Sequence, residues 1–331
     1  MGELSPVVIK QFGVEDMKIT RDKANYICET PDGPRLIYKT SDESARIIFQ
    51  HEIKEYLNGA GFSQTDRYVL SETGEPYVFI GGEYFVMTHC ANLRDSNFNN
   101  PDDIAGAIKA IAKFHQCARN VPFKEDTEVF RQTVSLNEHY RKQSSELEAV
   151  RKRLNRQARL SDFDVLFIKN AGHYSGLIKD AVFAIEKTDY IEKRGKALNE
   201  NHICHNALKE ECLLLPGPGQ EEGDFYLTQF SEAAVDLQLN DVARLVRRYV
   251  QRAGQEAKPL GFIFETYERT APLTQSDIGI VKAMLAYPHA FVKIMNLFYS
   301  KKRSWTPNAL INRMQSVVSE REVYERYIAA V

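Results

Sequence analysis

The feature that most constrains the fold is a change of hydrophobic pattern about 90 residues into this chain of 331 residues. Before the change, short runs rich in Ile, Tyr, Val and Phe are separated by turn residues, as in β-strands. After residue 100, apolar residues recur every three or four positions over long stretches, as in amphipathic helices. This order predicts a small strand-rich part followed by a larger helical part.

The strand-rich part contains two predicted hairpins and one helix. Residues 17–41 hold two strand-like runs joined by Pro-Asp-Gly-Pro at 31–34, which is a turn sequence. Residues 42–62 predict a helix, because their isoleucines and leucine recur at roughly helical spacing and glycines follow. A second hairpin is predicted at 76–90, with a Gly-Gly pair at its turn.

The helical part begins at residue 100. Asn100 is suited to cap the first helix and Pro101 to occupy its first turn. Residues 136–190 predict two or three further helices. A short β island at 202–231 interrupts the helical pattern, and three or four helices are expected after it.

Aromatic residues near the end of the chain lie beside a basic run. Phe298, Tyr299 and Trp305 are expected to belong mostly to the core of the helical part. Any of them that is exposed next to the Lys-Lys-Arg run at 301–303 would suit a protein-docking surface, because aromatic residues and arginine are favoured interface anchors.

Composition and spacing argue against several classes of function. The net charge of −2 provides no basic field for nucleic acid or an anionic membrane, and no apolar run reaches the ~20 residues of a membrane helix. Five widely spaced cysteines without a C-x-x-C motif are expected to be reduced thiols of a cytoplasmic protein. His202, Cys204, His205 and Cys212 cannot all converge on zinc, because His202 and Cys204 share one face of a predicted strand while His205 points to the other face. We expect neither nucleic-acid binding nor membrane insertion.

The order of these segments, together with four short motifs, resembles a known family. The motifs are IAKFHQCARNVP (111–122), LSDFDVLFIKNAGHY (160–174), LQLNDVARLVRRYVQR (237–252) and AMLAYPHAFVKIMNLFYSKKRSWTP (283–307). They resemble the bacterial spore-coat (CotS-type) kinase-like family, which is related to aminoglycoside and choline phosphotransferases. The resemblance implies an α+β, two-lobed protein-kinase-like fold. Its β-rich N-terminal lobe would span residues 1–91, and its helical C-terminal lobe would span 92–331 with a degenerate catalytic-loop island at 202–231.

The resemblance also places the catalytic positions. Related phosphotransferases have a loop H-G-D-x-x-x-x-N and a later strand that ends in Asp, which supply a carboxylate and the metal ligands. The loop His falls on His205, its Gly on Asn206 and its carboxylate on Ala207, while the metal-binding positions fall on Cys212 and Gln229. Ala207 has no proton acceptor, Cys212 is a soft ligand, and Gln229 offers a neutral oxygen where Mg²⁺ prefers anionic oxygen. His205 is expected to hold the loop together.

The strand-rich part carries remnants of an ATP site in this resemblance. Lys39 occupies the position of the strand lysine that contacts phosphates, and its helix partner would be Glu52 or Glu55. The segment expected to cover the phosphates, residues 19–27, contains no glycine. Backbone N–H groups approach phosphate closely only where side chains are absent, so no cofactor is expected to bind.

These substitutions and the resemblance predict a spore coat-associated pseudokinase that acts as a structural or assembly protein without phosphotransfer. Synthesis in the cytoplasm, incorporation into the spore coat and other coat proteins as partners are expected. One alternative is an active ATP- and Mg²⁺-dependent phosphotransferase with unusual site residues, for which Asp224 and Asp236 are the nearest acids. Another is a nucleotide-binding, non-catalytic regulator. Turnover of ATP separates the first alternative from the rest, and binding without turnover marks the second.

Overall fold

The computed structural model describes residues 6–14, 18–22, 25–89, 92–123, 130–217, 224–299 and 307–329. The chain divides into two compact units, each assembled from separate stretches. Unit 1 consists of residues 1–131 and 200–238, and unit 2 of residues 132–199 and 239–331. The lobe boundary expected at residue 91 stays a prediction, because the two residues at the junction lie outside the described ranges.

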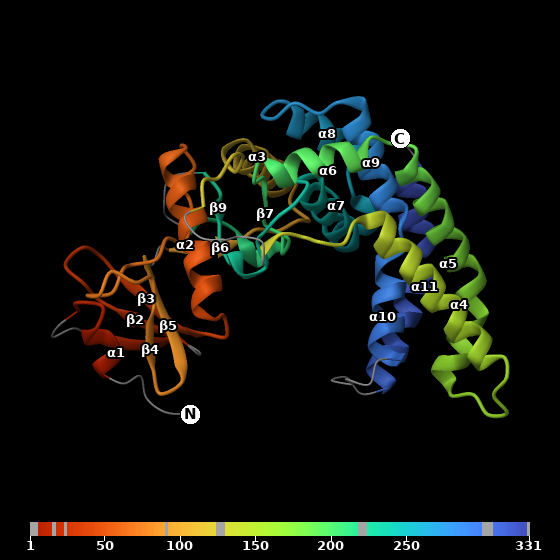
Figure 1. Cartoon of the computed structure of the whole chain (residues 1–331), viewed down its shortest axis with the longest axis horizontal. Helices are drawn as coiled ribbons and strands as arrows, with labels where there is room; N and C mark the ends of the chain where they lie inside the picture. Colours follow the sequence, from red (N-terminus) through yellow and green to blue (C-terminus); the bar gives the residue numbers. More distant parts are fainter. Residues whose placement is uncertain are drawn as a thin grey trace. The chain divides into compact units, whose positions relative to one another are not determined.

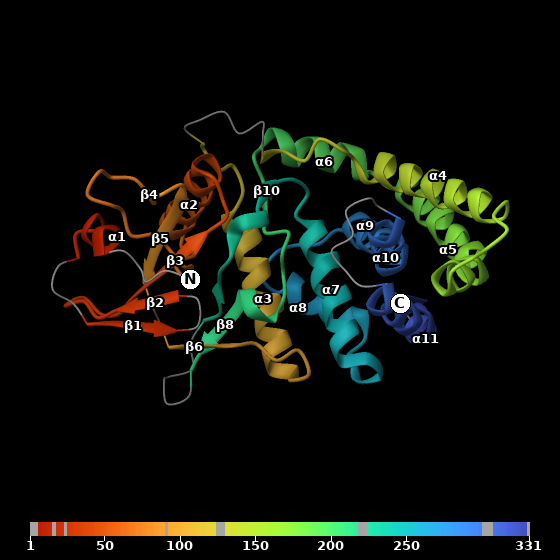
Figure 2. The same cartoon turned by 90° about the horizontal axis from the view of Figure 1, so that it is seen from below.

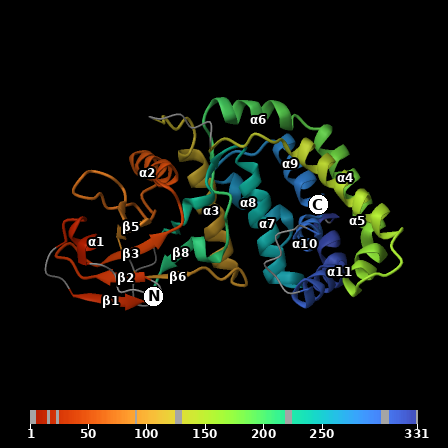
Figure 3. The ribbon, with the colours of Figure 1, turned by 60° about the horizontal axis from the view of Figure 1, so that its bottom comes forward.

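A five-stranded antiparallel sheet forms the N-terminal part of unit 1 (Figure 3). Its strands are β1 (Ile19–Asp22), β2 (Asn25–Cys28), β3 (Arg35–Thr40), β4 (Val78–Ile80) and β5 (Glu83–His89), in the order β1-β2-β3-β5-β4. The sequence predicted two strands for residues 17–41, and this was wrong, because the structure has three. Strands β1 and β2 are antiparallel, and the sequence between them contains no glycine or proline that would have predicted a turn.

Successive residues of the central strands lie on opposite faces of this sheet. The face that carries Ile37 packs against apolar residues of the segment that begins with helix α1 (Pro6–Lys10). The face that carries Tyr38 packs against Ile47 of helix α2 (Ser44–Gly59), which is the helix predicted for residues 42–62. The sheet of unit 1 is therefore covered by helical structure on both sides.

The rest of unit 1 contains helix α3 (Pro101–Cys117) and two small sheets. Strands β6 (Leu93–Asp95), β8 (Leu213–Pro216) and β9 (Tyr226–Leu227) form one sheet, and β7 (Ile203–Cys204) pairs with β10 (Ala234–Val235). Helix α3 begins as predicted, because the side chain of Asn100 accepts a hydrogen bond from the backbone N of Asp102 at 2.9 Å. The predicted β island at 202–231 is confirmed.

The chain leaves unit 1 after Arg131 and returns at Glu200. Arg131 forms a parallel β-bridge with Val235, and its Nη2 donates to Oδ1 of Asn201 at 2.6 Å. The point of exit and the point of return are therefore tied together within unit 1.

Unit 2 is built from helices. They are α4 (Leu136–Leu154), α5 (Asp162–Glu186), α6 (Tyr190–Asn199), α7 (Leu239–Ala253), α8 (Leu260–Glu268), α9 (Gln275–Ala286), α10 (His289–Tyr299) and α11 (Pro307–Ala329). Figures 1 and 2 show α4 and α5 lying side by side. In the described residues, five α-helices follow the island, so the prediction of three or four was too low. Phe298 stacks on Phe163 with ring centroids 3.7 Å apart, which confirms its expected place in the core, whereas Trp305 and the basic run lie outside the described residues.

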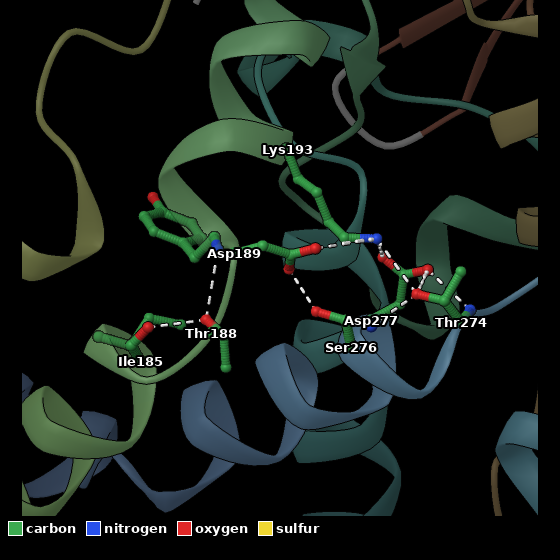
Figure 4. Close-up of polar contacts among 8 residues, drawn as sticks. Ile185, Thr188, Asp189, Lys193, Thr274, Ser276 and Asp277 are labelled. Carbon is green, nitrogen blue, oxygen red and sulfur yellow. Dashed lines mark hydrogen bonds and ion pairs between the residues drawn. The ribbon is translucent and has the colours of Figure 1, made fainter.

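Hydrogen bonds and ion pairs attach the start of α9 to α6 and to Asp189, the residue that precedes α6 (Figure 4). Thr274 and Asp277 cap the helix reciprocally, with Thr274 N donating to the Asp277 carboxylate at 2.8 Å and Asp277 N donating to Thr274 Oγ1 at 3.1 Å. Lys193 of α6 donates to Asp277 at 2.8 Å and lies 3.8 Å from Asp189, which also accepts a hydrogen bond from Ser276. Burial alone would raise the pKa of Asp277, but the bonds from Lys193 and Thr274 hold it below its ordinary value.

Within the described ranges, no individual helix has both the length and the apolar composition needed to cross a membrane. Helices α9 and α10 meet that requirement only when taken together, with a bend of 41° between them.

Candidate functional site

His205 ties the predicted loop to the chain that follows β9. Its side chain is fully buried, its Nε2 donates to the carbonyl oxygen of Thr228 at 2.8 Å, and its Nδ1 accepts from the backbone N of Ala207 at 3.3 Å. The ring also meets Phe230 edge-on, with centroids 4.9 Å apart. Backbone groups engage both ring nitrogens, which selects the neutral tautomer protonated at Nε2.

Two residues of the site adopt left-handed backbone conformations. Asn206, at the position where the resemblance places a glycine, has φ 63°, and Gln229 has φ 63° and ψ 59°. Asparagine is among the residues that tolerate this region best, whereas glutamine visits it rarely. The unusual backbone of Gln229 is maintained by contacts of its main chain and side chain with neighbouring segments.

The structure brings Ala207, Cys212 and Gln229 together. The Sγ of Cys212 donates to the carbonyl oxygen of Ala207 at 3.2 Å and lies 3.6 Å from Oε1 of Gln229. The Nε2 of Gln229 donates to the carbonyl oxygen of Glu211 at 2.9 Å. Both ends of the exposed Gln229 amide are therefore bonded to protein atoms. The three positions form a neutral hydrogen-bonded group, which we call the Ala207–Cys212–Gln229 cluster.

The chemistry of this cluster does not fit a magnesium ion. Burial raises the pKa of the Cys212 thiol to about 11, so the sulfur is protonated at neutral pH, whereas a metal ligand must be a thiolate. Mg²⁺ prefers carboxylate, phosphate and water oxygens. Among the residues that the structure describes, no three His, Cys, Asp or Glu side chains are grouped so that they could hold a metal.

The two acids that could act as replacement ligands have other contacts. Asp224 forms an ion pair with Lys113 at 3.6 Å, and its side chain is 66% exposed. Asp236 is buried, and its Oδ1 accepts a hydrogen bond from the backbone N of Leu237 at 2.8 Å. These contacts give Asp236 a structural role in the local backbone and leave Asp224 at the surface.

A buried ion pair that the sequence analysis missed lies next to Gln229. Lys54 of α2 is completely buried, and its Nζ lies 2.9 Å from both Oδ1 and the main-chain oxygen of Asp66. Oδ2 of Asp66 accepts from the backbone N of Gln229 at 3.4 Å. The ammonium also lies 3.8 Å from the ring centre of Tyr68. Burial lowers the pKa of Lys54, and the charge of Asp66 opposes that shift.

The segment around Asp66 joins the N-terminal part of unit 1 to the β island. The backbone N of Leu227 donates to the carbonyl oxygen of Gln64 at 2.9 Å, and Thr65 forms a parallel β-bridge with Leu227. The hydrogen bond from the backbone N of Gln229 to the side chain of Asp66 adds a further link between the same two segments. Protein contacts alone therefore position the backbone at Gln229.

Lys39 has an acidic partner that the sequence analysis did not consider. Its side chain is 55% exposed on β3 and forms an ion pair with Glu83 of β5. Glu55, one of the two helix acids considered as its partner, instead binds Arg67 through two hydrogen bonds of 2.8 and 2.6 Å. Glu52 is half-buried on α2. The assignment of Lys39 and Glu52 to an ATP site stays a prediction.

Several phosphotransferases are among the solved structures with the same fold. An aminoglycoside phosphotransferase from Alicyclobacillus acidocaldarius has a TM-score of 0.82 at 17% identity, over 100% of this chain and 96% of that chain. A spectinomycin phosphotransferase in complex with ADP and spectinomycin has a TM-score of 0.64 at 11% identity, over 97% of each chain. These similarities confirm the predicted α+β, aminoglycoside phosphotransferase-like fold class.

Sequence comparison identifies the family. Spore coat protein S of Bacillus subtilis (strain 168) is 18% identical over 304 residues, which cover 91% of this chain and 84% of that protein. Residues 6–331 match the family described as "Spore coat putative kinase YutH". The resemblance to spore-coat kinase-like proteins is thereby confirmed, and the chain belongs to the YutH family of spore coat kinase-like proteins.

Proposed function

We propose that this protein is a spore coat pseudokinase, which contributes to the structure or assembly of the coat and does not transfer phosphate. The observation that carries the proposal is the Ala207–Cys212–Gln229 cluster, whose members bond to one another and include no carboxylate. Phosphoryl transfer depends on positioned charges and metal ions around the transferred group. A neutral cluster at those three positions supplies neither.

The charged groups beside the cluster support the same conclusion. The buried Lys54 ammonium is enclosed between Asp66 and the ring of Tyr68, so it cannot reach a phosphate without leaving Asp66. Lys39 is accessible, but its ion pair lies on the sheet surface with Glu83. Both lysines are therefore engaged in ion pairs with acidic residues of the protein itself.

The first experiment measures nucleotide binding and turnover by the purified chain. A ligand at 100 times its Kd stabilises a protein by about 2.7 kcal/mol, so binding of millimolar Mg²⁺-ATP would raise the melting temperature visibly. We expect no shift and no release of phosphate. Metal-dependent turnover that is lost in Lys39→Ala would contradict the proposal and establish a phosphotransferase. A thermal shift without turnover would instead establish a nucleotide-binding regulator.

A second experiment restores the missing groups. In a variant combining Ala207→Asp, Cys212→Asn and Gln229→Asp, two new carboxylates would lie close to each other and to Asp66. Like charges at such short range repel, so we expect a lower melting temperature without metal and a partial recovery with Mg²⁺. The single variant Cys212→Ser adds no charge and serves as the control, with no response to Mg²⁺.

The role in the coat rests on family membership and on the similarity to Spore coat protein S. A tagged chain expressed in sporulating cells of its source is expected in the coat fraction of purified spores. The Lys39→Ala variant should be incorporated into the coat to the same extent as the wild type, since a structural role does not need a phosphate-binding lysine. Absence of the wild-type chain from the coat fraction would refute the coat role and leave the enzymatic experiments unaffected.

A further inference from the structure

A groove within unit 2 lies between helices α4 and α10. It has a volume of about 350 Å³, and its lining includes His139 of α4 together with His289, Lys293 and Asn296 of α10. Small-molecule sites commonly enclose about 300–1,000 Å³, so the groove is large enough for a compact organic ligand. None of these residues belongs to the Ala207–Cys212–Gln229 cluster.

One face of α10 supplies most of the polar lining. His289, Lys293 and Asn296 follow one another at spacings of four and three residues, which places them on the same side of the helix. All three side chains are exposed, and Nδ2 of Asn296 donates to Oε1 of Gln143 at 2.7 Å. The exposed ring of His139 lies on α4, the other side of the groove. Hydrogen-bond donors from two helices therefore converge on one space.

Positive charge gathers around this groove. Packing around the inner edge of its ring lowers the pKa of His289 to about 3, and the charges of Arg247, Arg244 and Lys293 lower it further, so this imidazole is a neutral donor at pH 7 beside three cations. The structure records a hydrogen bond from Arg247 to the carbonyl oxygen of Met284 at 3.2 Å. Among the described side chains, no carboxylate lies within ion-pair distance of Arg247 or Lys293. The cations around the groove are therefore not neutralised by partners within it.

One acid influences the groove from α4. Burial lowers the pKa of His139. The charge of Glu146 raises that pKa, and the charge of Lys142 lowers it. The carboxylate of Glu146 accepts from Nε2 of Gln143 at 2.8 Å and lies 4.0 Å from Lys142. Its charge is thus partly balanced on its own helix, and the excess of positive charge remains.

The groove also contains a buried hydroxyl group that needs a partner. The ring of Tyr287 stacks on Tyr140 with centroids 3.9 Å apart, and its hydroxyl has no hydrogen-bond partner within the part of the chain that the structure describes. Because the hydroxyl is covered, a ligand oxygen would accept from it only after a small movement of the Tyr287 side chain, and that bond would satisfy a group that is otherwise unsatisfied. Val292 and Leu297 add apolar surface beside it.

We propose that this groove binds a small organic anion, whose phosphate or carboxylate group is held by Lys293, His139 and His289. Its apolar body would lie against Tyr287, Val292 and Leu297. Ammonium and imidazole donors form strong, charge-assisted hydrogen bonds with such oxyanions. The inference stands apart from the proposed function, because it uses no residue of the catalytic-loop remnant.

Isothermal titration of the full chain at constant ionic strength tests this site with three ring-sized probes. Phenyl phosphate and benzoate carry the two anionic groups, and benzyl alcohol is the neutral control. We expect at least one anion to bind at least ten times more tightly than benzyl alcohol, and the tighter anion identifies the ligand class. Binding of neither anion below 10 mM, or equal binding of benzyl alcohol, would refute the proposal.

Substitutions then locate the site. Lys293→Met should weaken the better anion about tenfold or more, because a charge-assisted hydrogen bond is worth about 1.5–3 kcal/mol. Lys293→Arg should retain most of the affinity. Lys169→Met removes another exposed lysine of unit 2, on α5, and should bind like the wild type. His139→Gln is a second variant on the opposite helix, which should also weaken binding. Unchanged affinity in both Lys293→Met and His139→Gln would overturn the assignment.

Discussion

Lys54 and Asp66 form an ion pair with unequal burial, because the lysine side chain is completely buried while that of Asp66 is 18% exposed. Their Nζ–Oδ1 distance is 2.9 Å. The same aspartate accepts a hydrogen bond from the backbone of Gln229, so the pair fastens α2 to the segment that follows β9. Removal of Asp66 would leave a buried cation without its partner, whereas removal of Lys54 would leave an acid that water can reach.

This asymmetry predicts different costs for the two substitutions. Asp66→Asn should destabilise unit 1 by about 3 kcal/mol, and Lys54→Met should cost less, because breaking a buried pair is most expensive when a charge stays buried. Glu55→Gln disrupts the more exposed pair with Arg67 and should cost less than about 1 kcal/mol. Urea denaturation followed by circular dichroism measures all three, and equal losses would contradict the unequal burial.

The capping network of α9 predicts a pH dependence in unit 2. Because the folded-state pKa of Asp277 is held below its ordinary value of 3.8, its carboxylate stabilises the fold above that pH. The contribution is lost as the pH falls through the lowered folded-state pKa. Asp277→Asn should therefore cost about 1 kcal/mol at pH 7 and progressively less below pH 3.8. Thermal melts of both proteins at pH 7 and pH 3 test this, and a constant difference would argue against it.

The raised pKa of Cys212 predicts low thiol reactivity. At pH 7.5 a thiol with a pKa of about 11 holds over 100 times less thiolate than one near 8.5. Iodoacetamide should therefore label Cys212 far more slowly in the native protein than after unfolding in guanidinium. Mass spectrometry of the peptide that contains Cys212 measures both rates. Rapid labelling of the native protein would mean that this position of the cluster is open and ionised.

Two helical glycines should respond to alanine in opposite directions. A Cβ atom at Gly106 of α3 would lie 2.2 Å from the ring of Phe225, so Gly106→Ala forces the ring to move and should cost about 1–3 kcal/mol. Gly172 is exposed on α5 with no atom within 4 Å of such a Cβ. Gly172→Ala should stabilise the protein by about 0.5–1 kcal/mol through helix propensity. Melting temperatures of the two variants show whether each substitution stabilises or destabilises the protein.

Sequence reasoning succeeded where local chemistry decides the structure. Asn100 and Pro101 define the start of α3, because a cap and a fixed φ angle act within one turn. The Pro-Asp-Gly-Pro turn was recognised for a similar reason, and it separates β2 from β3. The structure also places Ala207, Cys212 and Gln229 in contact or near contact, while their assignment as former catalytic positions, made from the resemblance to phosphotransferases, stays a prediction.

Features that depend on pairing between distant segments could not be predicted. The partner of Lys39 is Glu83, and only the register of β3 against β5 brings these two residues close. Lys54 was missed because a lysine in a helix is normally assigned to the solvent face. Its position seven residues after the buried Ile47 was the available signal, since residues seven apart share a helix face. Its partner Asp66 lies on a separate segment.

The tie between Arg131 and Asn201 has a consequence for the modular organisation of the chain. Residues 132–199 leave and re-enter unit 1 at neighbouring points, so topologically they are an insertion into a closed surface turn. Insertions at such turns disturb the host fold least. The helices of this segment pack against α9, α10 and α11 within unit 2, so a change in their packing affects unit 2 first, while the residues around Gln229 keep their geometry. Joining Arg131 to Glu200 with a short linker and ending the chain at Gln238 would accordingly yield unit 1 as one continuous polypeptide.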